Sequence, residues 1–187
     1  MPDFIEEFLG ETAVIAARLD REAIRRAAAT LRAAGCSSSA SHAANDFRKL
    51  AAFEAYAPTD NVSKLTARAN DEGWETVFAV WLEGSRLRRE DCLLVFSVGG
   101  GDLERNVSPN LVKAVRFAKE RSAAIVGVVG RDGGFTAREA DVAVVIPPIN
   151  PDRVTPHTEA MHGVIWHLLA SHPDLKSAPA KWESTTR

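Results

Sequence analysis

Two separated segments of the chain each carry histidine and acidic residues at helical spacing. His42 and Asp46 stand four positions apart, and Glu159 precedes His162 and His167 in a later segment. Residues three or four apart share one helix face, and eight residues span just over two turns. Imidazole and carboxylate groups suit Zn²⁺ or another first-row divalent ion, and they also suit proton transfer near pH 7. For any one histidine taken alone, a helix surface or a satisfied core position is the competing interpretation.

A second candidate site is the glycine-rich stretch from Ser97 to Ser108, which follows an apolar run and precedes a helical pattern. Its glycines, Gly99, Gly100 and Gly101, allow backbone N–H groups to approach a ligand closely. Ser108 is a favourable N-cap residue, and a helix N-terminus attracts phosphate. The stretch is neither a Gly-x-Gly-x-x-Gly nor a Walker sequence, so it does not indicate a nucleotide. Phosphate binding and a plain flexible turn both remain open.

The elements that must position these residues follow from hydrophobic patterning. Short apolar runs predict buried strands at 93–97, 123–129 and 141–147. Helical patterns cover 2–34, 41–53, 61–68, 72–82, 108–121, 136–140 and 155–172. Alternating strands and helices imply a parallel sheet with right-handed crossovers, in which ligands bind beyond the carboxyl ends of the strands. We therefore expect the site in the loops after Phe96, Val129 and Ile146.

Length and composition predict one globular domain. The chain has 187 residues, of which 45% are hydrophobic, and a formal net charge of −2. The near-neutral balance gives no electrostatic reason to expect a nucleic-acid partner. Cys36 and Cys92 alone do not form a disulfide framework, which favours a cytoplasmic protein. The longest apolar run, near Ala123–Gly130, is too short to cross a membrane, and the N-terminus lacks a signal-peptide layout.

The domain organisation expected is a single unit over 1–187. Residues 1–34 form N-terminal helices, residues 35–172 form the α/β core, and residues 173–187 form a polar tail. The apolar stripe of the N-terminal helices can pack against another subunit or against its own domain.

Several segments together resemble the sugar isomerase (SIS) domain family, in its sedoheptulose-7-phosphate isomerase (phosphoheptose isomerase) branch. The resemblance spans nearly the whole chain after residue 35. The segments that carry it are Ala40-Ser-His-Ala-Ala-Asn-Asp-Phe, Leu65-Thr-Ala-Arg-Ala-Asn-Asp-Glu-Gly-Trp, Asp91-Cys-Leu-Leu-Val-Phe-Ser-Val-Gly-Gly, Gly127-Val-Val-Gly-Arg-Asp-Gly-Gly, Ala140-Asp-Val-Ala-Val-Val-Ile-Pro and Thr158-Glu-Ala-Met-His-Gly-Val-Ile-Trp-His.

The resemblance implies a three-layer sandwich, a parallel sheet flanked by helices, assembled as a homotetramer with active sites between subunits. It implies the isomerisation of sedoheptulose 7-phosphate to a heptose 7-phosphate through an enediol. The alternative is a non-catalytic module that binds a phosphorylated sugar. Mere binding does not require paired bases, which argues for the enzyme.

The resemblance also implies roles for individual residues. Asp46 and His167 match the proton-transfer pair, with Asp46 one methylene shorter than the usual Glu. The positions that bind zinc in some members are His42, Asp46, Glu159 and His167. Residues that match or adjoin substrate- and phosphate-binding positions are Ser97, Gly99, Gly100, Ser108, Asp71, Cys36 and Ser37.

The chain departs from the family pattern at two places. Val98 and Gly99 replace a usual threonine and serine, and Asp102–Val107 lengthens the loop. Upstream of Cys36, a strand and most of a Gly-x-Gly-Gly-Ser loop are expected to be missing. Either they are truly lost or the sequence closes over a gap. The second is favoured because deleting an interior strand would expose an apolar slot.

Overall fold

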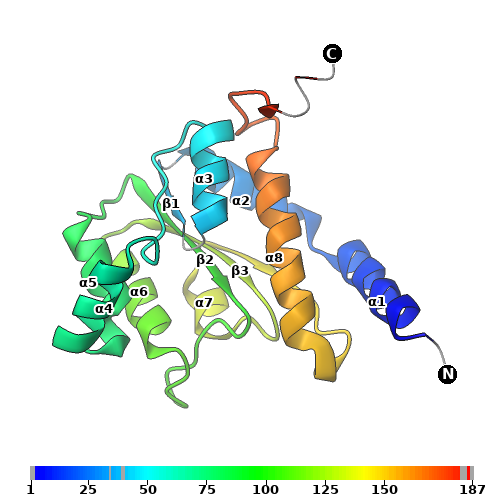
Figure 1. Ribbon diagram of the computed structural model, residues 1–187, viewed down its shortest axis with the longest axis horizontal. Coiled ribbons are helices and arrows are strands. Elements are labelled where there is room, and N and C mark those ends of the chain that lie inside the picture. Colours follow the sequence, from blue (N-terminus) through cyan, green and yellow to red (C-terminus); the bar gives the residue numbers. More distant parts are fainter. Residues whose placement is uncertain (1–2, 34, 39–40, 182–184, 186–187) are drawn as a thin grey trace.

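A computed structural model describes residues 3–33, 35–38, 41–181 and 185, with the backbone alone for 35–38. Its centre is one parallel sheet of four strands in the order β1-β2-β3-β4 (Figure 1). The strands are β1 (Gly35–Ser38), β2 (Asp91–Ser97), β3 (Ala124–Val129) and β4 (Val142–Val145). The three strands expected from apolar runs are confirmed.

The strand register aligns the carboxyl ends of three strands. Ser97 pairs with Val129, and Val129 pairs with Val145. The loops that leave β2, β3 and β4 therefore start side by side at one edge of the sheet. This is the edge at which open parallel sheets bind ligands.

Helices cover both faces of the sheet, which gives the expected three layers (Figure 1). Alternate residues of β2 separate the two cores: Cys92 and Leu94 belong to one buried cluster, and Leu93 and Val95 to the other. On the first face lie α2 (Arg21–Ala33), α3 (Ser41–Leu50) and α8 (Val154–Ala170). On the second lie α5 (Val77–Gly84), α6 (Pro109–Glu120) and α7 (Gly134–Glu139). The remaining elements are α1 (Phe4–Arg18), α4 (Val62–Asp71), η1 (Trp74–Thr76) and η2 (Pro151–Arg153).

The expectation that the first strand is missing is wrong. Gly35–Ser38 forms β1 and pairs in parallel with β2, from Gly35 opposite Asp91 to Ser38 opposite Leu94. Backbone groups along the edge of β2 need partners, and even a small polar segment can supply them. Four small residues carry no alternating or apolar pattern, so periodicity could not reveal this strand.

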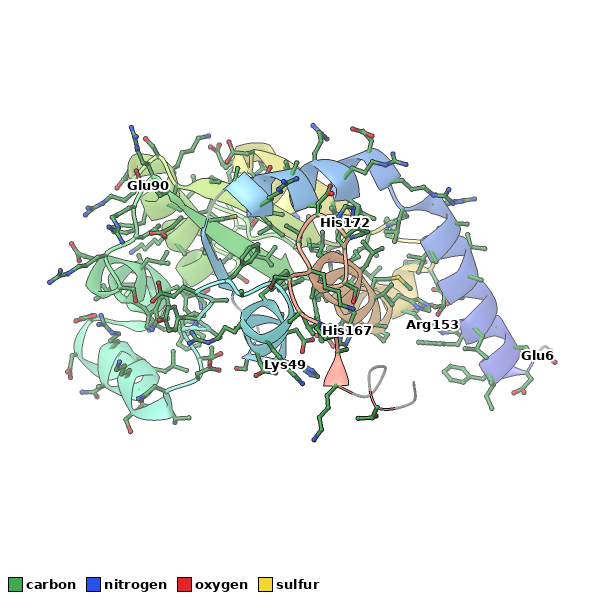
Figure 2. The ribbon with its side chains drawn as sticks, turned by 90° about the horizontal axis from the view of Figure 1, so that it is seen from above. Glu6, Lys49, Glu90, Arg153, His167 and His172 are labelled. Atoms are coloured by element: carbon green, nitrogen blue, oxygen red, sulfur yellow. The ribbon has the colours of Figure 1, made fainter. Side chains whose placement is uncertain are left out.

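The N-terminal segment forms two helices with different environments. Helix α2 is amphipathic, and its buried face packs on β4 and β3. Helix α1 projects at the side of the molecule (Figure 2) and leaves Phe4, Ile5 and Leu9 exposed. Its attachment is polar, because Glu11 pairs with His157 and with Arg153. In the described part of the chain, every helix is too short or too polar to cross a bilayer.

Candidate active site

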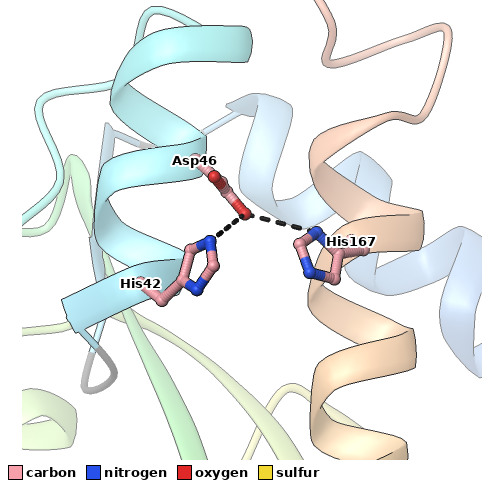
Figure 3. Close-up of side chains that lie close together, drawn as sticks. All are labelled: His42, Asp46 and His167. Atoms are coloured by element: carbon pink, nitrogen blue, oxygen red, sulfur yellow. Dashed lines mark ion pairs between the residues drawn. The ribbon is translucent and has the colours of Figure 1, made fainter. Parts of the chain in front are cut away.

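The two predicted histidine–acid segments come together across helices α3 and α8 (Figure 3). Asp46 Oδ2 lies 3.6 Å from His42 Nε2 and 3.3 Å from His167 Nδ1. The two imidazole rings meet edge to face, with their centroids 5.6 Å apart. Two histidines from distant parts of the chain thus share one carboxylate oxygen, as the resemblance implied for this pair of helices.

The burial of these side chains is unequal. The Asp46 side chain is 12% exposed, whereas those of His42 and His167 are 65% and 56% exposed. Asp46 sits on the face of α3 that packs inward, one position before the fully buried Phe47. The carboxylate is therefore held at the floor of the cluster, and both imidazoles lie at its mouth, where a small molecule can reach them.

Trp166 is a further member of the site. Its indole Nε1 donates a hydrogen bond to Asp46 Oδ2 at 3.2 Å, and its ring lies 5.6 Å from that of His42 and 5.1 Å from that of His167. The sequence pattern predicted only a core or interface role for this residue. The available signal was that a half-buried indole N–H needs an acceptor, and Trp166 directly precedes His167.

The donor atoms of His42, Asp46 and His167 all lie within 4.8 Å of one another. In a tetrahedral zinc site with bonds near 2.1 Å, ligand atoms lie about 3.4 Å apart. The separations of 3.3 and 3.6 Å match that spacing, and two imidazoles with one carboxylate are a suitable ligand set for zinc. These residues therefore fit a divalent cation.

Glu159 lies outside this group and is exposed. Eight residues of helix place it about 12 Å along the axis from His167. The structure thus brings together three of the four expected ligands.

His162 faces the sheet rather than the cluster. Its ring packs edge to face on Phe96 with centroids 5.3 Å apart, and its Nε2 is buried without a hydrogen-bond partner. Burial lowers the pKa of His162 to about 4, opposed by a hydrogen bond to the backbone of Val128. The expectation that His162 points into the same cleft as Glu159 and His167 is wrong, because three residues turn the helix by less than a full turn.

The glycine-rich loop after β2 is held against the start of α7. The carbonyl of Gly100 accepts hydrogen bonds from the N–H and the hydroxyl of Thr136, both at 2.8 Å. A Cβ on Gly100 would lie 1.9 Å from the carbonyl oxygen of Gly133, and its φ is +68°. Only glycine can occupy that position. Its N–H donates to Ser97 Oγ at 3.1 Å, so Gly100 serves the loop itself.

Beside this loop lies a cavity of about 930 Å³ at the carboxyl edge of the sheet. Ser97, Gly99 and Ser108 line it, and Gly100 does not. Ser108 stands at the N-cap position of α6 but makes no side-chain cap, and its φ of +50° is left-handed. The expected cap is therefore wrong, since that backbone conformation leaves the hydroxyl out of reach of the first turn.

The cavity and the histidine cluster are linked through one side chain. Phe96, directly before Ser97, contacts the Trp166 ring with centroids 6.1 Å apart. Helix α3 begins three residues after β1 ends, so its first turn, with His42, lies near the carboxyl edge of the sheet. Phosphate anchoring and proton transfer thus have candidate sites around the same edge.

Three expected residues are not brought to the cluster. Asp71 is exposed at the end of α4 and accepts a hydrogen bond from Asn70, and α4 lies well away from α8 in both views (Figures 1 and 2). The side chains of Cys36 and Ser37 lie outside those that the structure describes.

The sequence is similar to those of several curated proteins. The chain is 38% identical over 145 residues to the lincomycin biosynthesis protein LmbN of Streptomyces lincolnensis, covering 72% of this chain and 51% of that protein. It is 36% identical over 111 residues to the phosphoheptose isomerase of a Nitratiruptor species, covering 59% of this chain and 54% of that protein. No family model matches the chain.

The fold is similar to that of the phosphoheptose isomerase GmhA from Neisseria gonorrhoeae. The TM-score is 0.73 at 23% identity, over 89% of this chain and 95% of that one. The chain spans about half the length of the first curated relatives it matches.

Proposed function

The chain belongs to the sugar isomerase (SIS) domain family, in its phosphoheptose isomerase branch, and on that basis we propose that it is a phosphosugar aldose–ketose isomerase. The substrate we propose is sedoheptulose 7-phosphate, converted to a heptose 7-phosphate. The observation that carries the proposal is the contact of His167 with Asp46 at 3.3 Å, which puts an imidazole beside a carboxylate across two helices.

Aldose–ketose isomerisation moves one proton between neighbouring carbons and one between the two oxygens. Asp46 and His167 are the acid–base pair that we assign to these transfers. One takes the proton from the carbon beside the carbonyl and gives an enediol, and the other serves the oxygens; the first then returns its proton to the adjacent carbon. The Trp166 N–H holds Asp46 Oδ2 in place during these steps.

The cofactor we propose is a divalent metal, Zn²⁺, held by His42, Asp46 and His167, with Glu159 as a fourth ligand only if its side chain can be brought closer. Such an ion would polarise the carbonyl and hold the substrate hydroxyls. A carboxylate that ligates a metal is a weaker base, so His167 and Asp46 cannot both serve fully as ligands and as proton carriers.

The phosphate of the substrate is assigned to the cavity beside the glycine-rich loop. Ser97 and Ser108 line it with hydroxyls, and Gly99 lets the ligand approach the backbone. Asp71, Cys36 and Ser37 remain proposed substrate contacts.

We also propose that the chain forms one SIS domain that assembles as a homotetramer in the cytoplasm. The exposed Phe4, Ile5 and Leu9 of α1 support an apolar interface. The buried free thiol of Cys92 is compatible with a reducing compartment.

A second candidate function is phosphosugar binding without turnover. The exposed position of Glu159, outside the three-residue group, favours it, because the expected ligand set is incomplete.

Turnover of sedoheptulose 7-phosphate, followed by NMR, separates the two functions. We expect the full chain to isomerise the sugar and His167→Ala to lower kcat by about 100-fold or more while the sugar phosphate still binds. His172→Ala, just beyond the end of the same helix, is the matched control and should keep full activity. A chain that binds the sugar phosphate but never turns it over would support the binding module instead.

A further inference from the structure

We propose that Arg131 is a ligand of the substrate phosphate, an inference that rests on the proposed phosphosugar isomerase function. Arg131 stands in the loop after β3 and lines the same cavity as Ser97 and Ser108. A guanidinium offers several N–H donors in a planar fork that matches phosphate oxygens.

The glycine-rich loop has few donors of its own left for an anion. The N–H of Gly100 already donates to Ser97 Oγ, and the N–H of Asp102 donates to the carbonyl of Val107 at 2.9 Å. The two residues after Ser97 carry no polar side chain. The side chains of the loop thus offer neutral hydroxyls, whereas a doubly charged phosphate group needs a positive partner in a site withdrawn from water.

The cavity wall carries three arginines and two aspartates: Arg105, Arg131, Arg138, Asp102 and Asp132. Arg105 is already engaged, because its guanidinium lies 3.8 Å from Asp102 and its backbone N–H donates to the same carboxylate. Arg138 lies in the field of Asp102 and of Glu139. Among the described residues, no carboxylate oxygen lies within 4.0 Å of the Arg131 guanidinium. Arg131 is therefore the cation with its charge available.

The position of Arg131 is set by its backbone and by its neighbour. Its φ of +54° is left-handed, which is unfavourable for a residue with a side chain. Its Cδ lies 3.9 Å from the place a Cβ would take on Gly99, so its aliphatic stem runs over the loop. The absence of a side chain at Gly99 leaves the room in which the stem lies, and the stem brings the charge to the serine hydroxyls.

Calorimetric titration of the full chain with inorganic phosphate and with sedoheptulose 7-phosphate tests the inference. We expect Arg131→Ala and Arg131→Gly to weaken both affinities by about 10- to 100-fold, as loss of a charge-assisted hydrogen bond does. The affinity of the unchanged chain should also fall more steeply with added salt than that of either variant. Arg88→Ala, an exposed arginine before β2, is the control and should bind as the unchanged chain does.

Arg131→Gly separates binding from folding, because glycine accepts the left-handed backbone without strain and should melt no lower than the unchanged chain. If both Arg131 variants bind phosphate as tightly as the unchanged chain, or if the unchanged chain binds none, the inference is overturned. If phosphate binding depends on Arg131 but no sugar is isomerised, the inference holds and the isomerase proposal fails. Full isomerase activity with an unchanged KM in Arg131→Ala would have the opposite meaning.

Discussion

Trp166 holds Asp46 through a hydrogen bond of 3.2 Å between the indole Nε1 and Oδ2, the same oxygen that lies 3.3 Å from His167. Adjacent residues of α8 therefore contact one carboxylate from α3. One approaches as an indole donor from a half-buried position, and the other as an exposed imidazole. The acid of the proposed proton-transfer pair is thus fixed by a residue that has no acid–base chemistry of its own.

Replacing that indole tests the positioning role. We expect Trp166→Phe to keep most ring contacts with Phe96 but to lose the hydrogen bond, which lowers stability by about 1 kcal/mol and kcat by about 10-fold. Chemical denaturation and isomerase assays measure the two effects. Trp81→Phe, in the core on the other face of the sheet, is the control. It should cost stability without a selective loss of kcat; equal kcat losses in both variants would argue against positioning.

Metal binding should depend on the three-residue group. We expect zinc to bind the purified chain and raise its melting temperature, because binding to the folded state alone stabilises it. His42→Ala should weaken zinc affinity by more than about 100-fold, since changes even to residues around a ligand cost about 10- to 100-fold. Titration calorimetry checks this, with His172→Ala as the control. Equal zinc affinity in His42→Ala and the unchanged chain would exclude this site.

His162 should make the fold less stable in mild acid. Burial lowers its pKa to about 4 in the folded state from its ordinary value of 6.5, so between these values the unfolded chain binds more protons. Stability is then fully retained above pH 6.5 and lost as pH falls toward 4, by up to about 3 kcal/mol. Denaturant unfolding of the unchanged chain and of His162→Gln at about pH 7 and about pH 5 measures this. The variant should lose less between the two pH values, and identical losses would contradict the prediction.

Gly100 should be indispensable to the loop. We expect Gly100→Ala to cost about 2 kcal/mol or more, because a Cβ would collide with the Gly133 carbonyl at a left-handed backbone position. Gly10→Ala in α1 is the control, because nothing lies within 4 Å of its Cβ position and alanine favours a helix by about 1 kcal/mol. Thermal unfolding compares them. A stable Gly100→Ala variant would show that the loop has a different packing.

Much of the fold could be predicted from the chain alone. The buried strands at β2, β3 and β4 appear as continuous apolar runs because both faces of a parallel sheet are covered. The boundaries of α4 and α8 fall within a few residues of those expected, and Asn61 caps α4 by accepting from the N–H of Lys64. These features depend on local patterns, which a sequence records directly.

What the sequence by itself determined is the set of chemical groups: two histidine–acid pairs at helical spacing and a glycine-rich loop between a strand and a helix. What only the tertiary structure decided is which groups meet. Asp46 and His167 lie in contact, Trp166 joins them, and Glu159 and Asp71 stay apart. The reason is physical: periodicity gives the face of a helix, but the contacts between α3, α8 and the sheet depend on how distant side chains pack.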